Sequence, residues 1–161
     1  MIETYWKKMT QYNFALCYLR LYLGRSIKTN RIINICVTIT SSAAIAAWAA
    51  WQDLAFIWGL IIVLSQVVFS INQFLPYQKR IEDISGLLSK WNGLYINIES
   101  DWYKVSNGKL SEEEINDLCY DYMRKWDSVD NEYFVGDTLP KKEKLIQIAE
   151  EMKNNYFENN F

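Results

Sequence analysis

The sequence contains no histidine, and this absence removes the side chain that proteins use most often as a general base and as a metal ligand. Nucleophile-elbow, phosphate-loop, zinc-protease and dinucleotide-binding patterns are also absent. Asp53 stands alone inside an apolar stretch and has no second titratable group nearby with which to share a proton. We therefore expect no enzymatic activity, no cofactor and no metal site.

Cysteines are few, and no segment alternates apolar and polar residues as a strand does. The three cysteines, Cys17, Cys36 and Cys119, are odd in number and lack the CxxC spacing of zinc or redox sites. We interpret them as reduced structural thiols. The absence of strand-like alternation predicts an all-α protein.

Charge is missing from two long stretches on either side of Asp53, of 21 residues (32–52) and 25 residues (54–78). A helix of about 20 apolar residues crosses a hydrocarbon layer of ~30 Å. The pattern predicts a transmembrane hairpin over residues 32–78, with spans at about 33–51 and 55–75 and Asp53 at its tip. Both flanks are basic, since residues 1–31 carry six Lys/Arg and one acid, and Lys79 and Arg80 follow the second run. The positive-inside rule then places both termini in the cytoplasm of a multi-pass protein of the bacterial inner membrane.

Two groups of residues in these spans are candidates for helix contacts. Small residues four apart would let a neighbouring helix approach closely. Polar residues on the spans would have to find partners, because an unpaired amide in hydrocarbon is strongly unfavourable. These polar residues either line a pore or form hydrogen bonds between the spans without a pore. The packing candidates are Ala43, Ala46, Ala47, Ala50 and Gly59, and the polar candidates are Asn34, Thr38, Gln66, Ser70 and Gln73.

Residues 79–161 are predicted to form a cytoplasmic helical domain. Apolar residues recur at alternating steps of three and four over 81–105, which is typical of a helical bundle or coiled coil. Gly86 and Gly93 lie opposite this stripe and either admit another backbone or face solvent. The candidate residues for oligomerisation on the stripe are Ile84, Leu88, Trp91, Tyr95, Ile98 and Trp102.

Further helix boundaries follow from local signals. Asn107 and Gly108 are expected to end the heptad helix, and Ser111 with Glu114 predicts a capping box for the next one. Pro140 is expected in the first turn of a last helix. The tail NNYFENNF has no apolar period and is expected to fray.

The N-terminal segment, residues 1–31, shows helical spacing of apolar residues, with Gly24 as its expected C-cap. Its basic residues would reach lipid phosphates if the helix lies on a membrane face. The alternative is a helix that docks on the rest of the protein. Residues 79–161 carry 11 basic and 17 acidic residues, so we expect no nucleic-acid partner.

The order of a basic aromatic helix, a tight two-span hairpin and an all-helical tail joined through NQFLPYQKRIEDISGLLSKWNGLY resembles the SLATT family of bacterial two-transmembrane proteins. The resemblance covers roughly residues 5–135 and rests on architecture, without an invariant motif. It implies an antiviral-defence effector that acts by abortive infection. Such an effector oligomerises in the lipid bilayer and opens a pore when a sensor or nucleotide-second-messenger synthase encoded nearby signals. The alternative function is a non-conducting, membrane-anchored scaffold whose cytoplasmic helices recruit a partner protein.

Overall fold

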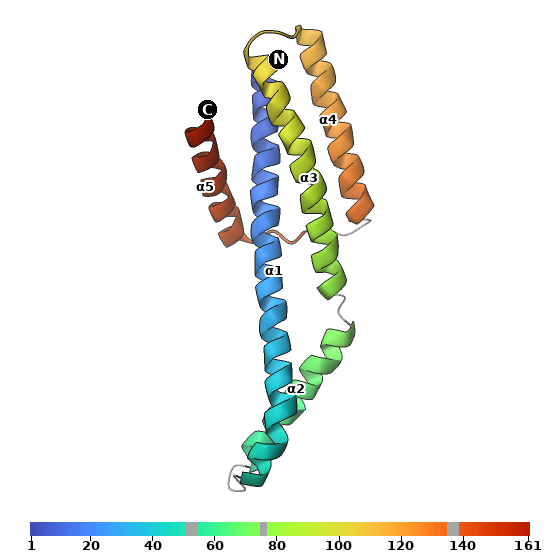
Figure 1. Cartoon of the computed structure of the whole chain (residues 1–161), viewed down its shortest axis with the longest axis vertical. Coiled ribbons are helices and arrows are strands. Elements are labelled where there is room, and N and C mark those ends of the chain that lie inside the picture. The colour runs from blue at the N-terminus through green and yellow to red at the C-terminus, as the bar shows by residue number, and fades with distance from the viewer. Residues whose placement is uncertain (51–54, 75–76, 135–138) are drawn as a thin grey trace. The chain divides into compact units, whose positions relative to one another are not determined.

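The computed structural model describes the chain over residues 1–50, 55–74, 77–134 and 139–161, and within these ranges it leaves the side chains of 39–50, 55, 58, 65, 68–69, 71–74 and 77 undescribed. Every regular element in this part of the chain is a helix, which confirms the predicted all-α class. The helices are α1 (Ile2–Ala50), α2 (Ala55–Phe74), α3 (Tyr77–Ser106), α4 (Glu112–Tyr133) and α5 (Glu143–Asn160) (Figure 1).

The chain divides into two compact units. Unit 1 comprises Met1–Leu23 and Asp83–Phe161, and unit 2 comprises Gly24–Glu82. The boundary falls at Gly24, which was expected to end the first helix. That prediction is wrong, since α1 continues unbroken through Gly24 to Ala50. Glycine weakens a helix by about 1 kcal/mol but does not stop it when the flanking residues favour helix.

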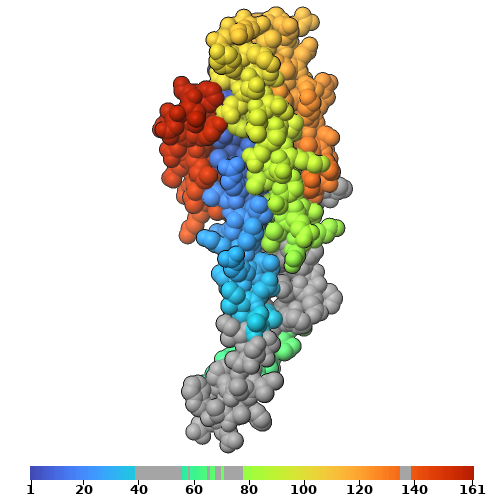
Figure 2. Space-filling model, viewed as in Figure 1, coloured from blue at the N-terminus to red at the C-terminus, as the bar shows by residue number. Residues whose placement is uncertain are grey.

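Unit 1 is a helical bundle whose core lies between the N-terminal part of α1 and helices α3, α4 and α5. In Figure 1 this part of α1 lies between α5 on one side and α3 with α4 on the other, and Figure 2 shows α5 covering its flank. Met9, Leu19, Ile84 and Leu87 have no exposed surface. The N-terminal helix therefore docks on the rest of the protein, as the second of its two predicted placements required.

The ends of α3 and α4 follow the predicted local signals. Helix α3 ends at Ser106, and Gly108 adopts a φ of +64° in the turn that follows. Left-handed backbone of this kind favours glycine. Ser111 caps α4 by accepting a hydrogen bond from the Glu114 backbone N–H, while the Glu114 carboxylate accepts one from the Ser111 backbone. The capping box is confirmed.

Helix α5 differs from its prediction at both ends. It begins at Glu143, three residues after Pro140, whose carbonyl accepts a hydrogen bond from the Tyr18 hydroxyl at 2.6 Å. It also includes nearly all of the tail that was expected to fray. The rings of Trp6 and Phe157 meet at 5.0 Å, and the rings of Trp6 and Phe161 at 5.5 Å. These aromatic contacts with α1 order the tail even though its sequence has no helical period.

The predicted location in the membrane is corrected by the structure. Within the described residues, no helix is both long enough and apolar enough to cross a membrane. The prediction of a multi-pass inner-membrane protein with two spans was therefore wrong. Absence of charge is a weaker criterion than apolar character, and the two uncharged runs hold many polar side chains. Those named in the prediction are Asn34, Thr38, Gln66, Ser70 and Gln73.

Several predicted contact residues of these runs lie outside the described part of the structure. Asp53 belongs to residues 51–54, which are not described, and only the backbone of Gln73 is described. The structure likewise describes only the backbone of the four packing alanines, Ala43, Ala46, Ala47 and Ala50.

Candidate functional site

The most distinctive surface of the described residues is an exposed apolar stripe on α2, in unit 2. Six large apolar side chains of this helix are exposed, from Val67 at 49% to Phe56 at 84%. With 3.6 residues per turn, they fall within an arc of about 120° on one side of the helix. They are Phe56, Ile57, Leu60, Val63, Leu64 and Val67, called here the α2 stripe. Apolar patches of this kind are rare on a protein surface unless something covers them.

Spacing along the α2 stripe matches the seam of a coiled coil. Phe56, Leu60, Val63 and Val67 follow one another at steps of four, three and four. This alternation keeps a row of apolar residues facing a neighbouring helix. The sequence from residue 55 to residue 74 contains no charged residue, so the stripe has no ionic rim on its own helix. The stripe is therefore suited to another uncharged helix surface.

The predicted polar residues of unit 2 lie beside this stripe or on α1. Gln66 and Ser70 are exposed, and Gly59 is exposed with nothing within 4 Å of an added Cβ. All three project from the helix on one edge of the α2 stripe. On α1, Asn34 and Thr38 are exposed, and the Thr38 hydroxyl donates to the Asn34 carbonyl at 2.8 Å. A hydroxyl bond to the carbonyl one turn earlier is one that threonine commonly forms within its own helix.

The six heptad residues predicted for oligomerisation lie in the core of unit 1. Trp91 stacks on Trp126 of α4 at 4.2 Å, and Trp102 meets Trp6 of α1 at 4.9 Å. Their partners belong to the same chain, so an oligomer that used these positions would require the core to open. Four of the six are buried and two are half-buried; the set is Ile84, Leu88, Trp91, Tyr95, Ile98 and Trp102.

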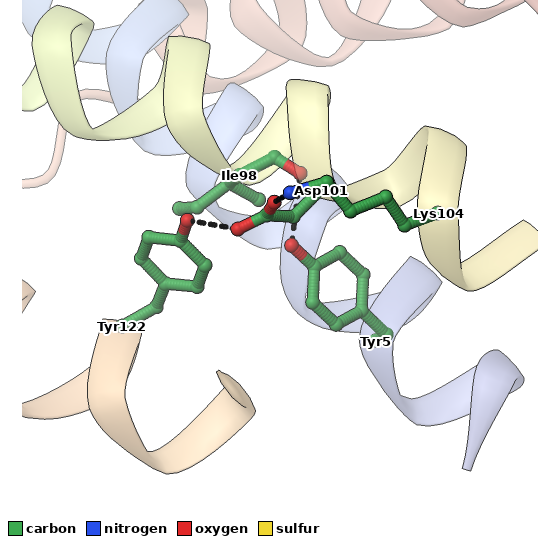
Figure 3. Close-up of polar contacts among 5 residues, drawn as sticks. All are labelled: Tyr5, Ile98, Asp101, Lys104 and Tyr122. Carbon is green, nitrogen blue, oxygen red and sulfur yellow. Dashed lines mark hydrogen bonds and ion pairs between the residues drawn. The ribbon is translucent and has the colours of Figure 1, made fainter. Parts of the chain in front are cut away.

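A polar cleft of about 720 Å³ lies between the end of α3 and the start of α4, beside Asp101. Figure 3 shows Tyr122 from α4 and Tyr5 from α1 directed toward this stretch of α3. The Tyr122 hydroxyl donates to the Asp101 carboxylate at 2.7 Å, Lys104 pairs with it at 2.6 Å, and Tyr5 donates to the Ile98 carbonyl at 2.8 Å. These contacts tie three helices together.

The titration behaviour of this cleft indicates a structural role. Burial acts to raise the pKa of Asp101, but hydrogen bonds from Lys104 and Tyr122 lower it below its usual value. Burial and the Asp101 carboxylate raise the pKa of Tyr122, so its hydroxyl stays protonated and keeps donating. Near neutral pH Asp101 is therefore ionised and Tyr122 is protonated.

Metal binding gains no support from the acids of this cleft. Asp117 and Asp121 share a helix face, but Asp121 pairs with Lys125 at 2.6 Å. The described residues contain no group of three or more His, Cys, Asp or Glu side chains that could hold a metal ion. The three cysteines are free thiols, with Cys17 buried, Cys119 half-buried and Cys36 exposed.

Comparisons with known proteins identify no relative: no family model matches the chain, and no curated protein or solved structure is significantly similar to it. The resemblance to the SLATT family thus stays a prediction.

Proposed function

We propose that the protein is a self-assembling helical scaffold, in which the α2 stripes of two or more copies pack together and unit 1 is left free to bind a partner protein. The exposure of the α2 stripe is the observation that supports this proposal. The roles in pore formation and antiviral defence remain predictions. Pore formation requires spanning helices, so we favour the scaffold.

A second copy of the chain is the occupant that best fits the α2 stripe. Its heptad spacing is the pattern by which like helices pair, with each side chain inserted between four of the neighbour. Because neither stripe carries charge, two copies meet without burying an unpaired ion. A symmetric pair also uses the same patch twice, as most homo-oligomers do.

The size of the stripe is sufficient to drive association. Burying an Ile, Leu, Val or Phe side chain completely contributes about 2 kcal/mol, so covering six that are roughly half-exposed contributes about 6 kcal/mol per copy. For two copies the sum is about 12 kcal/mol, which is comparable with the ~4–15 kcal/mol that association costs. Exposed Ile32 and Ile35 on α1 enlarge the apolar surface of unit 2.

The test is the mass of the full chain by light scattering in detergent-free buffer, for the wild type, Leu60→Glu and Ile96→Glu. Leu60 lies at the centre of the α2 stripe, and Ile96 is an equally apolar, 65% exposed residue on α3 of unit 1. We expect an oligomer for the wild type and for Ile96→Glu, and a monomer for Leu60→Glu.

A monomeric wild type at 100 µM, or two glutamate variants with the same mass as the wild type, would disprove self-assembly through α2. Vesicle flotation separates a further outcome. If the chain is monomeric in solution and floats with phosphatidylcholine vesicles in a manner that Leu60→Glu abolishes, lipid covers the stripe and the scaffold proposal is wrong.

A further inference from the structure

A second surface, the α1–α4 groove, lies entirely within unit 1 and is independent of self-assembly. It has a volume of about 390 Å³ and lies along α4 on the side where that helix meets Lys8 and Tyr12 of α1. Its floor is aromatic, its rim is partly apolar, and four charged side chains line it.

The floor of the α1–α4 groove is rigid. The rings of Tyr12 and Trp126 stack with centroids 4.3 Å apart, and Trp91 stacks against Trp126 at 4.2 Å. Trp126 is only 8% exposed, so its indole is fixed by its neighbours. A ligand that lies on this floor meets a surface that is already ordered, which lowers the entropic cost of binding. Because Tyr12 and Trp91 cover the two faces of the Trp126 indole, the ring that can attract a guanidinium or ammonium group through its face is the half-buried Tyr12.

The acidic end of the groove is formed by Asp127 and Asp130, one helical turn apart on α4. The half-buried Asp130 carboxylate has no ion pair or hydrogen bond within the described residues, and Asp127 only accepts from Asn131 at 3.3 Å. Burial, and then the charge of Asp127, raises the pKa of Asp130. Two carboxylates beside an aromatic floor suit a basic side chain.

The other end of the groove has the opposite charge. Arg124 lies one turn before Asp127, and Lys8 lies near Cys119, further toward the start of α4. Within the described part of the chain, neither cation forms an ion pair. Between the two ends, Met123 is 38% exposed, and a flexible thioether adapts to many apolar surfaces. The groove thus offers a cationic end, an apolar middle and an acidic end.

We propose that the α1–α4 groove binds a peptide segment of a partner protein, with a Lys or Arg side chain over the Tyr12 ring and paired with Asp127 and Asp130. An apolar side chain of the same segment contacts Met123, and an acidic one faces Arg124 and Lys8. Only a peptide supplies all three kinds of side chain in a row. A phosphate-bearing ligand is disfavoured because the two carboxylates repel it.

The test uses the full chain labelled with ¹³C-methyl methionine and a synthetic peptide, acetyl-AEAAALAARA-amide, with a twin that carries citrulline in place of arginine. Citrulline keeps the shape of arginine and removes its charge. The four methyl signals are assigned with single Met→Leu variants, among them Met9→Leu and Met123→Leu. We expect the arginine peptide to shift the Met123 signal and to leave the signal of buried Met9 unmoved. The citrulline twin should bind about tenfold more weakly.

The decisive variant is Asp127→Asn with Asp130→Asn, and its matched control is Asp117→Asn with Asp121→Asn, two acids of α4 that line the other cleft. The first variant should bind the arginine peptide as weakly as the wild type binds the citrulline twin, and the control should bind as the wild type does. The Asp130 substitution removes a charge that burial disfavours, so that variant stays folded.

Three outcomes would overturn the proposal. The first is equal affinity for the two peptides, or no shift at 5 mM peptide. The second is arginine-peptide binding that survives loss of Asp127 and Asp130. The third is a Met123 shift caused by adenosine monophosphate or by spermidine at least as strong as that caused by the peptide, which would assign the groove to an anion or to a small polycation.

Discussion

Gly86 and Gly93 lie seven residues apart on α3, and the structure gives them opposite surroundings. A Cβ added at Gly86 would stand 2.7 Å from Cε1 of Tyr133 and 3.0 Å from its Cζ and hydroxyl oxygen. A Cβ added at Gly93 meets nothing within 4 Å. Substitution of each glycine by alanine therefore separates helix propensity from packing. The close neighbour of Gly86 is a ring of α4, not the backbone that the sequence allowed.

The magnitudes can be worked from these contacts. Alanine stabilises a helix interior by about 0.8 kcal/mol relative to glycine, and Gly93→Ala should gain this amount in free energy of unfolding. At Gly86 the same gain is offset, because the Tyr133 ring must move by most of an ångström and overpacking of this kind costs about 1–3 kcal/mol. The Lys90 ammonium also lies 5.2 Å from the centroid of the Tyr133 ring, and the same ammonium pairs with the Glu132 carboxylate at 2.6 Å. We expect Gly86→Ala to be about 1–3 kcal/mol less stable than Gly93→Ala, measured by urea unfolding.

A double variant identifies the cause. In Gly86→Ala with Tyr133→Ala, the ring is gone and the alanine at position 86 should give its full gain relative to Tyr133→Ala alone. If Gly86→Ala and Gly93→Ala stabilise the protein equally, the close approach of Tyr133 to α3 does not restrain the fold and the reasoning fails. A penalty at Gly86 that persists without the Tyr133 ring would refute it as well.

Two further predictions concern the contacts around the α3–α4 cleft. Tyr5→Phe removes the donor to the Ile98 carbonyl and should lower the free energy of unfolding by about 1 kcal/mol in urea titrations, and an unchanged midpoint would show that this buried hydrogen bond adds no stability. Asp101→Asn should cost about 1 kcal/mol at pH 7, because Lys104 and Tyr122 stabilise the ionised form. The folded-state pKa of Asp101 is lowered, so this contribution is complete above the unfolded pKa of about 3.9 and is lost as pH falls through the folded value. The difference between wild type and variant should shrink as pH falls below the unfolded pKa, and a difference that does not change with pH would contradict the assignment.

Where structure follows from local chemistry, the sequence predicted it well. The heptad over 81–105 corresponds to the buried face of α3, since steps of three and four place residues on one side of a helix whatever covers them. The capping box at Ser111 needs only residues three apart. The identity of the covering partner is not local. The heptad residues were predicted as candidates for oligomerisation, and within unit 1 Trp91 packs on α4 and Trp102 packs on α1 of the same chain.

The error at Gly24 has a local cause, whereas long-range contacts explain the error in the tail. Helix α1 passes through Gly24 because one unfavourable residue is outweighed by a long favourable helix on both sides. The tail is helical because Phe157 and Phe161 reach Trp6, more than 150 residues earlier in the chain. The α1–α4 groove escaped prediction for the same reason. The positions of Tyr12 and Trp126 in the sequence do not predict that their rings stack.

The residues that suggested a membrane span also support self-assembly, because a span and a coiled-coil seam require apolar residues over different parts of the helix surface. A span requires apolar character on all sides of a helix of about 20 residues. A coiled-coil seam requires it on one side only, at steps of three and four. Phe56, Leu60, Val63 and Val67 satisfy the second condition, while Gln66 and Ser70 are exposed beside them. A glutamate at Leu60 should therefore abolish assembly, whereas Gln66→Leu, at the edge of the stripe, should leave the oligomer intact or strengthen it. Light scattering on this pair shows whether the stripe or the whole helix surface governs association, because dissociation by Gln66→Leu would place the contact on the polar edge.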